Sequence, residues 1–168
     1  MSKELEIENT FLLAKVPLKV IKEWKKDFTK DIYYPQDSDN PQIRLRQRGD
    51  RYMITKKYPL VKNDLSTMVE ETIKLTKAEY SFFATNLAGK SVAKNRYSMD
   101  FDDYVIEIDE YLELLSPLIV LDIEWRRKRG SYASIIKEFN AVKEITNVSA
   151  LAAGKMAGKT YDQIKNQF

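Results

Sequence analysis

The chain has 168 residues, of which 43% are hydrophobic and 32% charged, a composition typical of a globular protein with a core of its own. It contains no cysteine and no histidine, which excludes disulfides, thiol nucleophiles, serine–histidine triads and histidine-ligated zinc and leaves oxygen-held metals such as magnesium, manganese or calcium. The net charge of +3 does not by itself indicate nucleic-acid binding. No apolar run could span a bilayer or form a signal peptide, so we expect a cytoplasmic protein without a membrane segment.

The first predicted strand, residues 4–11, carries a carboxylate at every second position. Successive side chains of a strand point to opposite faces, so Glu4, Glu6 and Glu8 line one face and the apolar residues between them line the other. Three like charges in a row repel one another unless cations neutralise them. The stretch therefore fits either an acidic, solvated strand face or one half of a charge-matched site.

A helix is predicted next, from Pro17 to about Thr29, because apolar residues recur there at helical spacing: Leu18, Ile21, Trp24 and Phe28. Trp24 is expected to pack in the core. A short β-prone run, Asp31–Tyr34, follows, and residues 35–41 form a loop by composition.

Residues 43–57 predict a β-hairpin that turns at a Gly-Asp pair. Three arginines share one face of its first arm: Arg44, Arg46 and Arg48. The parity of the second arm stays open, so either Lys56 or Lys57 joins the arginine face.

Another strand is predicted over residues 67–75, after a loop, with Glu70 on its polar face. A register slip would exchange Glu70 for Glu71. A helix follows over residues 77–87, with Thr76 as its N-cap and a glutamate at the capping-box position.

Three more strands, each with a charged face of one sign, complete the predicted sheet: residues 91–98 with Lys94 and Arg96, residues 104–111 with Glu107 and Asp109, and residues 118–125 with Asp122 and Glu124. The basic turn at 126–130 is interpreted as a solvated turn rather than a nucleic-acid patch. Residues 150–168 are expected to be helical. We expect a single domain over residues 1–168, whose C-terminal part, from about residue 145, packs on the sheet or plugs it.

The charged faces are segregated by sign from strand to strand. An open antiparallel sheet could leave them in water, whereas a closed barrel would turn them inward around a wet lumen and put the apolar faces under the helices. Exposed like charges on neighbouring strands cost stability. Arginine and lysine bind phosphates, and clustered carboxylates hold hard cations that bridge phosphate oxygens. The pattern favours a barrel that binds a polyanion together with a divalent metal.

Seven segments in chain order resemble motifs of the CYTH superfamily, the triphosphate tunnel metalloenzymes. Glu6-Ile7-Glu8 is similar to the start of its ExExK signature, Arg44-Leu45-Arg46 to its RxR strand and Thr55-Lys56-Lys57 to its TxK strand. Glu70-Glu71 resembles its acidic strand, and Lys94-Asn95-Arg96-Tyr97 its KxRY strand. Asp109-Glu110-Tyr111 resembles its DxF segment, and Asp122-Ile123-Glu124 its ExE strand.

The resemblance implies an α+β fold, a closed eight-stranded antiparallel β-barrel or tunnel with a charged lumen and helices packed outside. It also implies hydrolysis of a triphosphate compound, inorganic triphosphate or another small triphosphate, with Mg²⁺ or Mn²⁺. The metal ligands that it implies are Glu6, Glu8, Glu70, Asp122 and Glu124. The triphosphate-binding residues that it implies are Arg44, Arg46, Lys56, Lys57, Lys94 and Arg96, and the catalytic ones are Glu6, Glu8, Arg46 and Lys57.

One position departs from the signature, because Thr10 stands where the family has a lysine that contributes to catalysis. Three functions therefore stay open: hydrolysis of a small triphosphate, cyclisation of ATP as in class IV-type adenylate cyclases, and metal-dependent triphosphate binding without turnover. The sequence does not decide whether the chain forms a homodimer.

Overall fold

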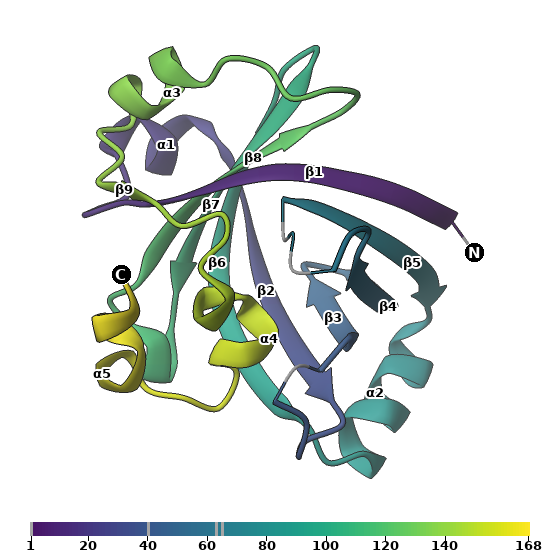
Figure 1. The fold of residues 1–168 in the computed structure, drawn as a ribbon. Helices are drawn as coiled ribbons and strands as arrows, with labels where there is room; N and C mark the ends of the chain where they lie inside the picture. Colours follow the sequence, from purple (N-terminus) through teal and green to yellow (C-terminus); the bar gives the residue numbers. More distant parts are fainter. Residues whose placement is uncertain (1, 40, 63, 65) are drawn as a thin grey trace.

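The structure, a computed structural model, describes residues 2–39, 41–62, 64 and 66–168, and for residues 2–6 it describes the backbone alone. Within these residues eight antiparallel strands follow one another in the order β5-β4-β3-β2-β6-β7-β8-β1, and β1 returns to pair with β5 (Figure 1). The expected closed eight-stranded barrel is thereby confirmed. The strands are β1 Ser2–Leu12, β2 Lys25–Tyr34, β3 Ile43–Arg48, β4 Arg51–Pro59, β5 Thr67–Leu75, β6 Lys90–Asp100, β7 Tyr104–Tyr111 and β8 Ile119–Trp125.

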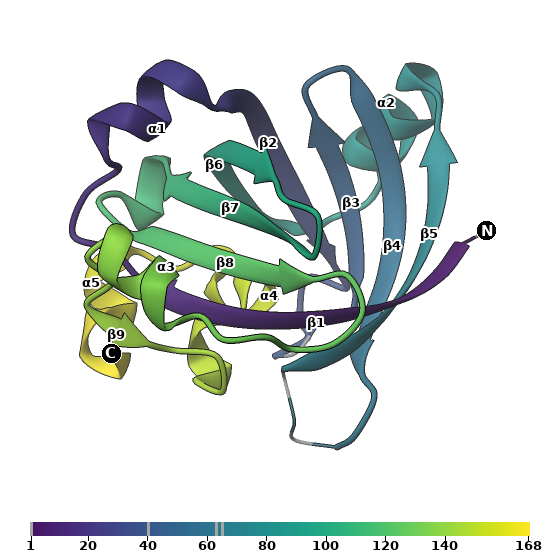
Figure 2. The same ribbon diagram turned by 90° about the horizontal axis from the view of Figure 1, so that it is seen from above.

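The barrel closes through β1, whose two halves pair with different neighbours. Residues 2–7 pair with β5 and residues 7–12 pair with β8. Figure 2 shows β3, β4 and β5 together on one side, β6, β7 and β8 on the other, and β1 running across both groups. A ninth strand, β9 (Lys143–Glu144), pairs with Phe11 and Leu12 and so covers β1 where β5 no longer reaches it.

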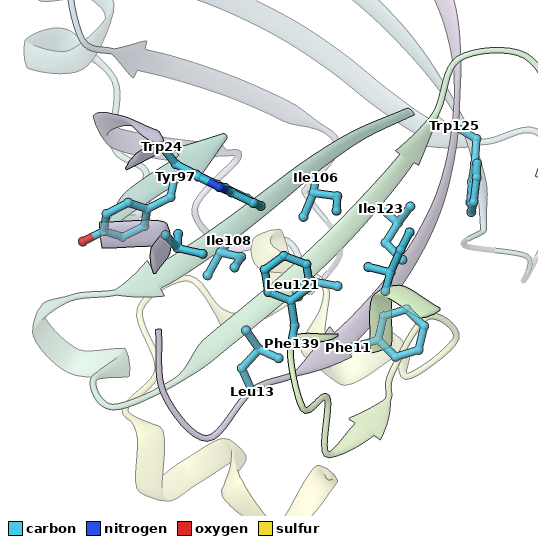
Figure 3. Packing of buried hydrophobic residues seen from close by; sticks show 12 residues of the cluster. Phe11, Leu13, Trp24, Tyr97, Ile106, Ile108, Leu121, Ile123, Trp125 and Phe139 are labelled. Carbon is cyan, nitrogen blue, oxygen red and sulfur yellow. The ribbon is translucent and has the colours of Figure 1, made fainter. Parts of the chain in front are cut away.

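Helices lie on the outside of the barrel, over the apolar outer faces of the strands. The helices α1 (Leu18–Glu23) and α3 (Ala133–Glu138) pack on β1, β6, β7 and β8, where Trp24 and Phe139 meet outward-facing side chains such as Ile108, Leu121 and Ile123 (Figure 3). The helix α2 (Lys77–Asn86) packs on the outer side chains of β2 to β5, among them Leu45. These two clusters form the hydrophobic core on the outer side of the sheet, which leaves the inner face for polar residues.

The predicted helix from Pro17 to about Thr29 is wrong in its second half, because α1 ends at Glu23 and β2 begins at Lys25. The chain is already extended at Trp24, which is buried as expected. Pairing with β3 on one edge and β6 on the other gives residues 25–34 more hydrogen bonds and more burial than a short surface helix could.

The predicted hairpin and the strands after it are confirmed to within one or two residues at most boundaries. Gly49 takes a positive φ of 54° at the hairpin turn, a conformation that suits glycine. Thr76 and Glu79 form the predicted capping box at the start of α2. No helix in the described part of the chain has the length and the apolar character needed to cross a membrane.

The C-terminal region consists of short helical turns rather than one helix, interrupted at Gly158, where φ is positive. They are the 3₁₀ turn η2 (Ser149–Leu151), α4 (Ala153–Met156), α5 (Tyr161–Ile164) and the 3₁₀ turn η3 (Lys165–Gln167), with another 3₁₀ turn, η1 (Glu113–Leu115), between β7 and β8. Apolar side chains of this region pack on inward-facing residues at one end of the barrel. That cluster includes Leu12, Tyr33, Val92, Tyr111 and Val120 from the strands and Leu151, Met156 and Ile164 from the C-terminal region.

Candidate active site

The strand register decides which side chains share the inner face of the barrel. Lys57 pairs with Glu70, and Thr55, two residues before Lys57, pairs with Arg44, so Lys57 lies on the arginine face. Lys56 pairs with Ile43 on the opposite face, where its side chain is exposed and its ammonium lies 5.9 Å from the ring centre of Tyr58. Of the two alternatives from the sequence, the structure places Lys57 inside and Lys56 outside.

The same register separates the two neighbouring glutamates of β5. Glu70 faces inward, and its Oε1 lies 3.3 Å from Nη2 of Arg44 and 3.5 Å from Nζ of Lys57. Burial raises the pKa of Glu70, but the charges of Arg44 and Lys57 lower it by more, so the net shift of the pKa is downward. Glu71 lies on the outer face and accepts a hydrogen bond from the Tyr58 hydroxyl at 3.2 Å.

Two arginine–aspartate pairs lie buried on the inner face. Nε and Nη2 of Arg46 donate to the two carboxylate oxygens of Asp31 at 2.6 and 2.7 Å. Nε and Nη2 of Arg96 donate to Asp109 in the same way, at 2.6 Å each, and Lys94 also donates to Asp109. Burial alone would raise the pKa of both aspartates, but the neighbouring cations hold it well below the usual range, so both carboxylates are ionised.

Further pairs extend this network toward the hairpin turn. Nη1 of Arg48 donates to Glu107 at 2.8 Å, and its Nε donates to Asp27 at 3.2 Å. Arg96 also pairs with Glu107. Sequence reasoning missed Asp27 because it placed a helix over the first part of β2, and it assigned Asp31 to a short β-prone run without a role in the site. The alternation of polar and apolar residues from Asp27 to Tyr34 was the signal that could have found them.

Carboxylates gather where β1 and β8 meet. Glu8 faces Glu124 across the ladder, and Thr10 faces Asp122. Burial, and then the charge of Asp109, raises the pKa of Asp122 to about 6, although Arg96 lies 4.0 Å away and the hydroxyl of Thr10 hydrogen-bonds to it. Nζ of Lys57 lies 3.9 Å from Glu8. This side of the lumen therefore combines carboxylates of β1 and β8 with cations of the neighbouring strands.

The donor chemistry of this side fits a hard divalent cation, which prefers carboxylate oxygens and would favour the ionised form of Asp122. Among the described side chains no group of three or more carboxylates is already arranged as a metal site. The side chain of Glu6, another predicted ligand, lies outside the described residues, although its backbone pairs with Met68 in β5. A cation here would draw the facing carboxylates of β1 and β8 together.

The structure brings most of the predicted site residues onto one inner face. These residues are Glu8, Arg44, Arg46, Lys57, Glu70, Lys94, Arg96, Asp122 and Glu124. Lys56 is the exception among the described side chains. The basic residues lie on β3, β4 and β6, and the carboxylates predicted to bind metal lie on β1, β5 and β8. Basic and acidic walls thus share one lumen.

Comparisons with known proteins agree with this arrangement. No protein-family model matches the chain. Over 132 residues the chain is 32% identical to an inorganic triphosphatase of Nitrosomonas europaea, a match that spans 77% of this chain and 82% of that protein.

Solved structures share the fold. The crystal structure of an inorganic triphosphatase superposes with a TM-score of 0.62 at 24% identity, over 90% of this chain and 97% of that one. A candidate adenylate cyclase from Bacillus halodurans superposes with a TM-score of 0.64 at 17% identity, over 85% and 95% of the two chains. A candidate adenylyl cyclase from Hippeastrum with a dominant triphosphatase activity has a TM-score of 0.52 at 14% identity, over 80% and 88%.

Proposed function

Because the chain belongs to the CYTH superfamily, the triphosphate tunnel metalloenzymes, we propose that it hydrolyses inorganic triphosphate, or another small triphosphate, with the help of Mg²⁺ or Mn²⁺. The observation that carries this proposal is the closed barrel whose inner face sets arginines and lysines on one wall against carboxylates on the other. The similarity to a triphosphatase over most of both chains supports the same reaction.

Arg44 and Lys57 are the cations that we assign to the phosphate chain. Both lie within 3.5 Å of one carboxylate oxygen of Glu70, and a phosphate oxygen carries comparable charge and can take its place. Nε of Arg44 is buried and has no hydrogen-bond partner among the described residues, so it is a donor that an incoming anion could satisfy. Positive charge at this position stabilises the negative charge that develops on the leaving phosphate.

Glu8, Asp122 and Glu124, with Glu6 from the same strand as Glu8, are the residues that would hold the metal ion. When bound, the ion polarises a phosphoryl oxygen and lowers the pKa of an attacking water. The carboxylates would hold the ion on the side of the lumen that faces the basic strands. Ionised carboxylates are required, so we expect metal binding to compete with the protonation of Asp122.

Phosphate release from tripolyphosphate with Mg²⁺ or Mn²⁺ tests the proposal. We expect the variants Glu6→Ala and Arg46→Ala to lose activity at least about 100-fold, as for other groups that stabilise transition-state charge. Full activity in excess chelator would refute the metal dependence.

Two adjacent lysines supply a matched pair for the same assay. Lys57→Ala should lose activity, whereas Lys56→Ala, on the outer face, should retain it. The reverse result would show that Lys56, and not Lys57, reaches the substrate.

The strongest alternative is binding without turnover, since Thr10 faces Asp122 where the family signature has a lysine. In that case the protein would bind tripolyphosphate with metal but release no phosphate, and Thr10→Lys should raise activity. The same assay with ATP, read for cyclic AMP, tests the cyclase alternative, which has only the shared fold in its favour.

A further inference from the structure

Asp31 is a buried carboxylate with a single hydrogen-bonded partner. It lies on β2 directly opposite Arg46 on β3, and its side chain is 0% exposed. Its other cross-strand neighbour, on β6, is the apolar residue Val92. Both of its oxygens accept hydrogen bonds from Arg46, at 2.6 and 2.7 Å. The carboxylate is thus directed at one guanidinium edge, the edge formed by Nε and Nη2.

The corresponding arginine on the other side of β2 is bound quite differently. Arg96 contacts three carboxylates: Asp109 holds its Nε and Nη2, Glu107 pairs with its Nη1, and Asp122 lies 4.0 Å from its Nη2. Nη1 of Arg46 makes no hydrogen bond to the residues that the structure describes, and Asp31 is the partner of its opposite edge. Arg46 therefore keeps donors for a ligand, whereas Arg96 is enclosed by acidic groups.

We propose that Asp31 is a positioning residue, which holds the Arg46 guanidinium through Nε and Nη2 so that Nη1 is presented to a phosphoryl oxygen of the substrate. This inference rests on the proposed function. Two parallel hydrogen bonds fix both the position and the plane of the guanidinium, which a single bond or a point charge would not do. An arginine fixed in advance loses less conformational freedom when the phosphate binds.

The ionisation state of Asp31 supports this role. Burial would raise its pKa, but Arg46, followed by Arg44 and Lys94, lowers it well below the usual range. The carboxylate is therefore ionised at neutral pH, and both of its oxygens accept hydrogen bonds from Arg46. Among the described residues Asp31 hydrogen-bonds to Arg46 alone, and Arg44 and Lys94 act on it through charge, so its positioning effect is exerted on the Arg46 guanidinium.

The test compares Asp31→Asn and Asp31→Glu with wild type. Asp31→Asn removes the charge, and Asp31→Glu retains it but shifts the guanidinium by one methylene. We expect kcat/KM for tripolyphosphate to fall about 10- to 100-fold in Asp31→Asn. This is the range found when a residue that orients a metal-binding side chain is replaced. Asp31→Glu retains the charge and should fold, with a lower Tm because the buried site must take an extra methylene, and it should still lose activity. Glu110→Gln, a carboxylate of the outer face of β7 that bonds to Asn95, is the matched control and should not change kcat/KM.

A double-mutant cycle separates positioning from a merely structural role. If Asp31 acts through Arg46, Asp31→Asn should cause no further loss in an Arg46→Ala background, although each single variant loses activity. Losses that multiply, or an Asp31→Glu variant with wild-type kcat/KM, would overturn the proposal. Failure of both Asp31 variants to fold would mark Asp31 as a structural residue and would overturn it too.

Calorimetric measurement of tripolyphosphate binding distinguishes a failure of this inference from a failure of the proposed function. If the wild-type protein binds tripolyphosphate without hydrolysing it, the proposed function fails, but the Kd values of the same variants still test Asp31. A Kd that is unchanged in both Asp31 variants would then refute the positioning role, and a 10-fold or greater rise that is absent in the Arg46→Ala background would support it.

Discussion

Asp122 is an inner-face carboxylate whose ionisation is disfavoured. Its pKa is raised to about 6 by burial and by the nearby charge of Asp109, with Thr10 in front of it instead of a cation. An unfolded aspartate titrates near 3.9, so the folded chain binds a proton here that the unfolded chain has already lost. The stabilising contribution of the protonated group is present below about pH 4 and is lost as the pH rises through 6.

The variant Asp122→Asn should remove this pH dependence. In metal-free buffer we expect the variant to be more stable than wild type at pH 8, and the difference in unfolding free energy to shrink by about 3 kcal/mol as the pH falls to 4. Chemical denaturation of both proteins at several pH values measures it. A difference that does not change with pH would show that Asp122 is not the titrating group.

At the scale of single elements, β1 depends on its neighbours for more than its ladder hydrogen bonds. Asn9 points outward from β1 and is buried; its amide nitrogen donates to Glu144 at 3.0 Å, and its oxygen accepts from Nε1 of Trp125 at 3.1 Å. Glu144 also accepts from Thr146, whose hydroxyl oxygen accepts from the amide of Thr10. These bonds attach the segment around β9 to the half of β1 that β5 does not reach.

Replacing Asn9 with alanine should weaken this attachment. The change leaves the indole N–H of Trp125 without its acceptor, so we expect Asn9→Ala to lower the unfolding free energy by about 1 to 3 kcal/mol. Asn86→Ala, at an exposed position of α2, is the control and should change it by less than about 0.5 kcal/mol. Equal effects of the two substitutions would contradict the importance of this contact.

The elements that sequence reasoning placed correctly carry two signals at once. The hairpin at 43–57 combines strict alternation with a turn glycine, and the strand at 104–111 combines alternation with acidic residues of one sign. The first part of β2 was missed because Leu18, Ile21 and Trp24 begin a helical spacing, whereas the helix ends at Glu23.

The site could be predicted only in part, because strand parity says which residues share a face but not which face is inside. Lys56 and Lys57 were equivalent until pairing with β3 and β5 fixed their sides. The pairing of Arg46 with Asp31 joins two strands across the β2–β3 connection, and no local pattern encodes it. The clusters of like charge, by contrast, were visible in the sequence and led directly to the inner face.

At the scale of the whole molecule, the lumen is polar at its middle and apolar at one end. Leu12, Tyr33 and Val120 continue the inner face beyond the charged residues, and Met156 and Ile164 of the C-terminal region pack on them. A highly charged phosphate chain would have to leave water and cross this apolar cluster to pass through the barrel. We therefore expect substrate to enter and leave at the charged end.

Hydrolysis of phosphate chains of different length tests whether the apolar cluster closes one end of the barrel to substrate. At equal concentrations of chain ends, we expect tripolyphosphate to be hydrolysed at least about 10-fold faster than long-chain polyphosphate, whose length cannot be accommodated past the apolar cluster. Phosphate release with each substrate measures the ratio. Equal rates would mean that the chain threads through the barrel or that the C-terminal region moves aside.

The divided pairing of β1 also affects how the protein is made. Residues 2–7 need β5 and residues 7–12 need β8, so β1 cannot complete its ladder until β8, which ends at Trp125, has been synthesised. Until then the acidic strand has an open edge, and the barrel has no closed lumen. Glu8 is therefore synthesised long before Glu124, the carboxylate that it faces across the ladder.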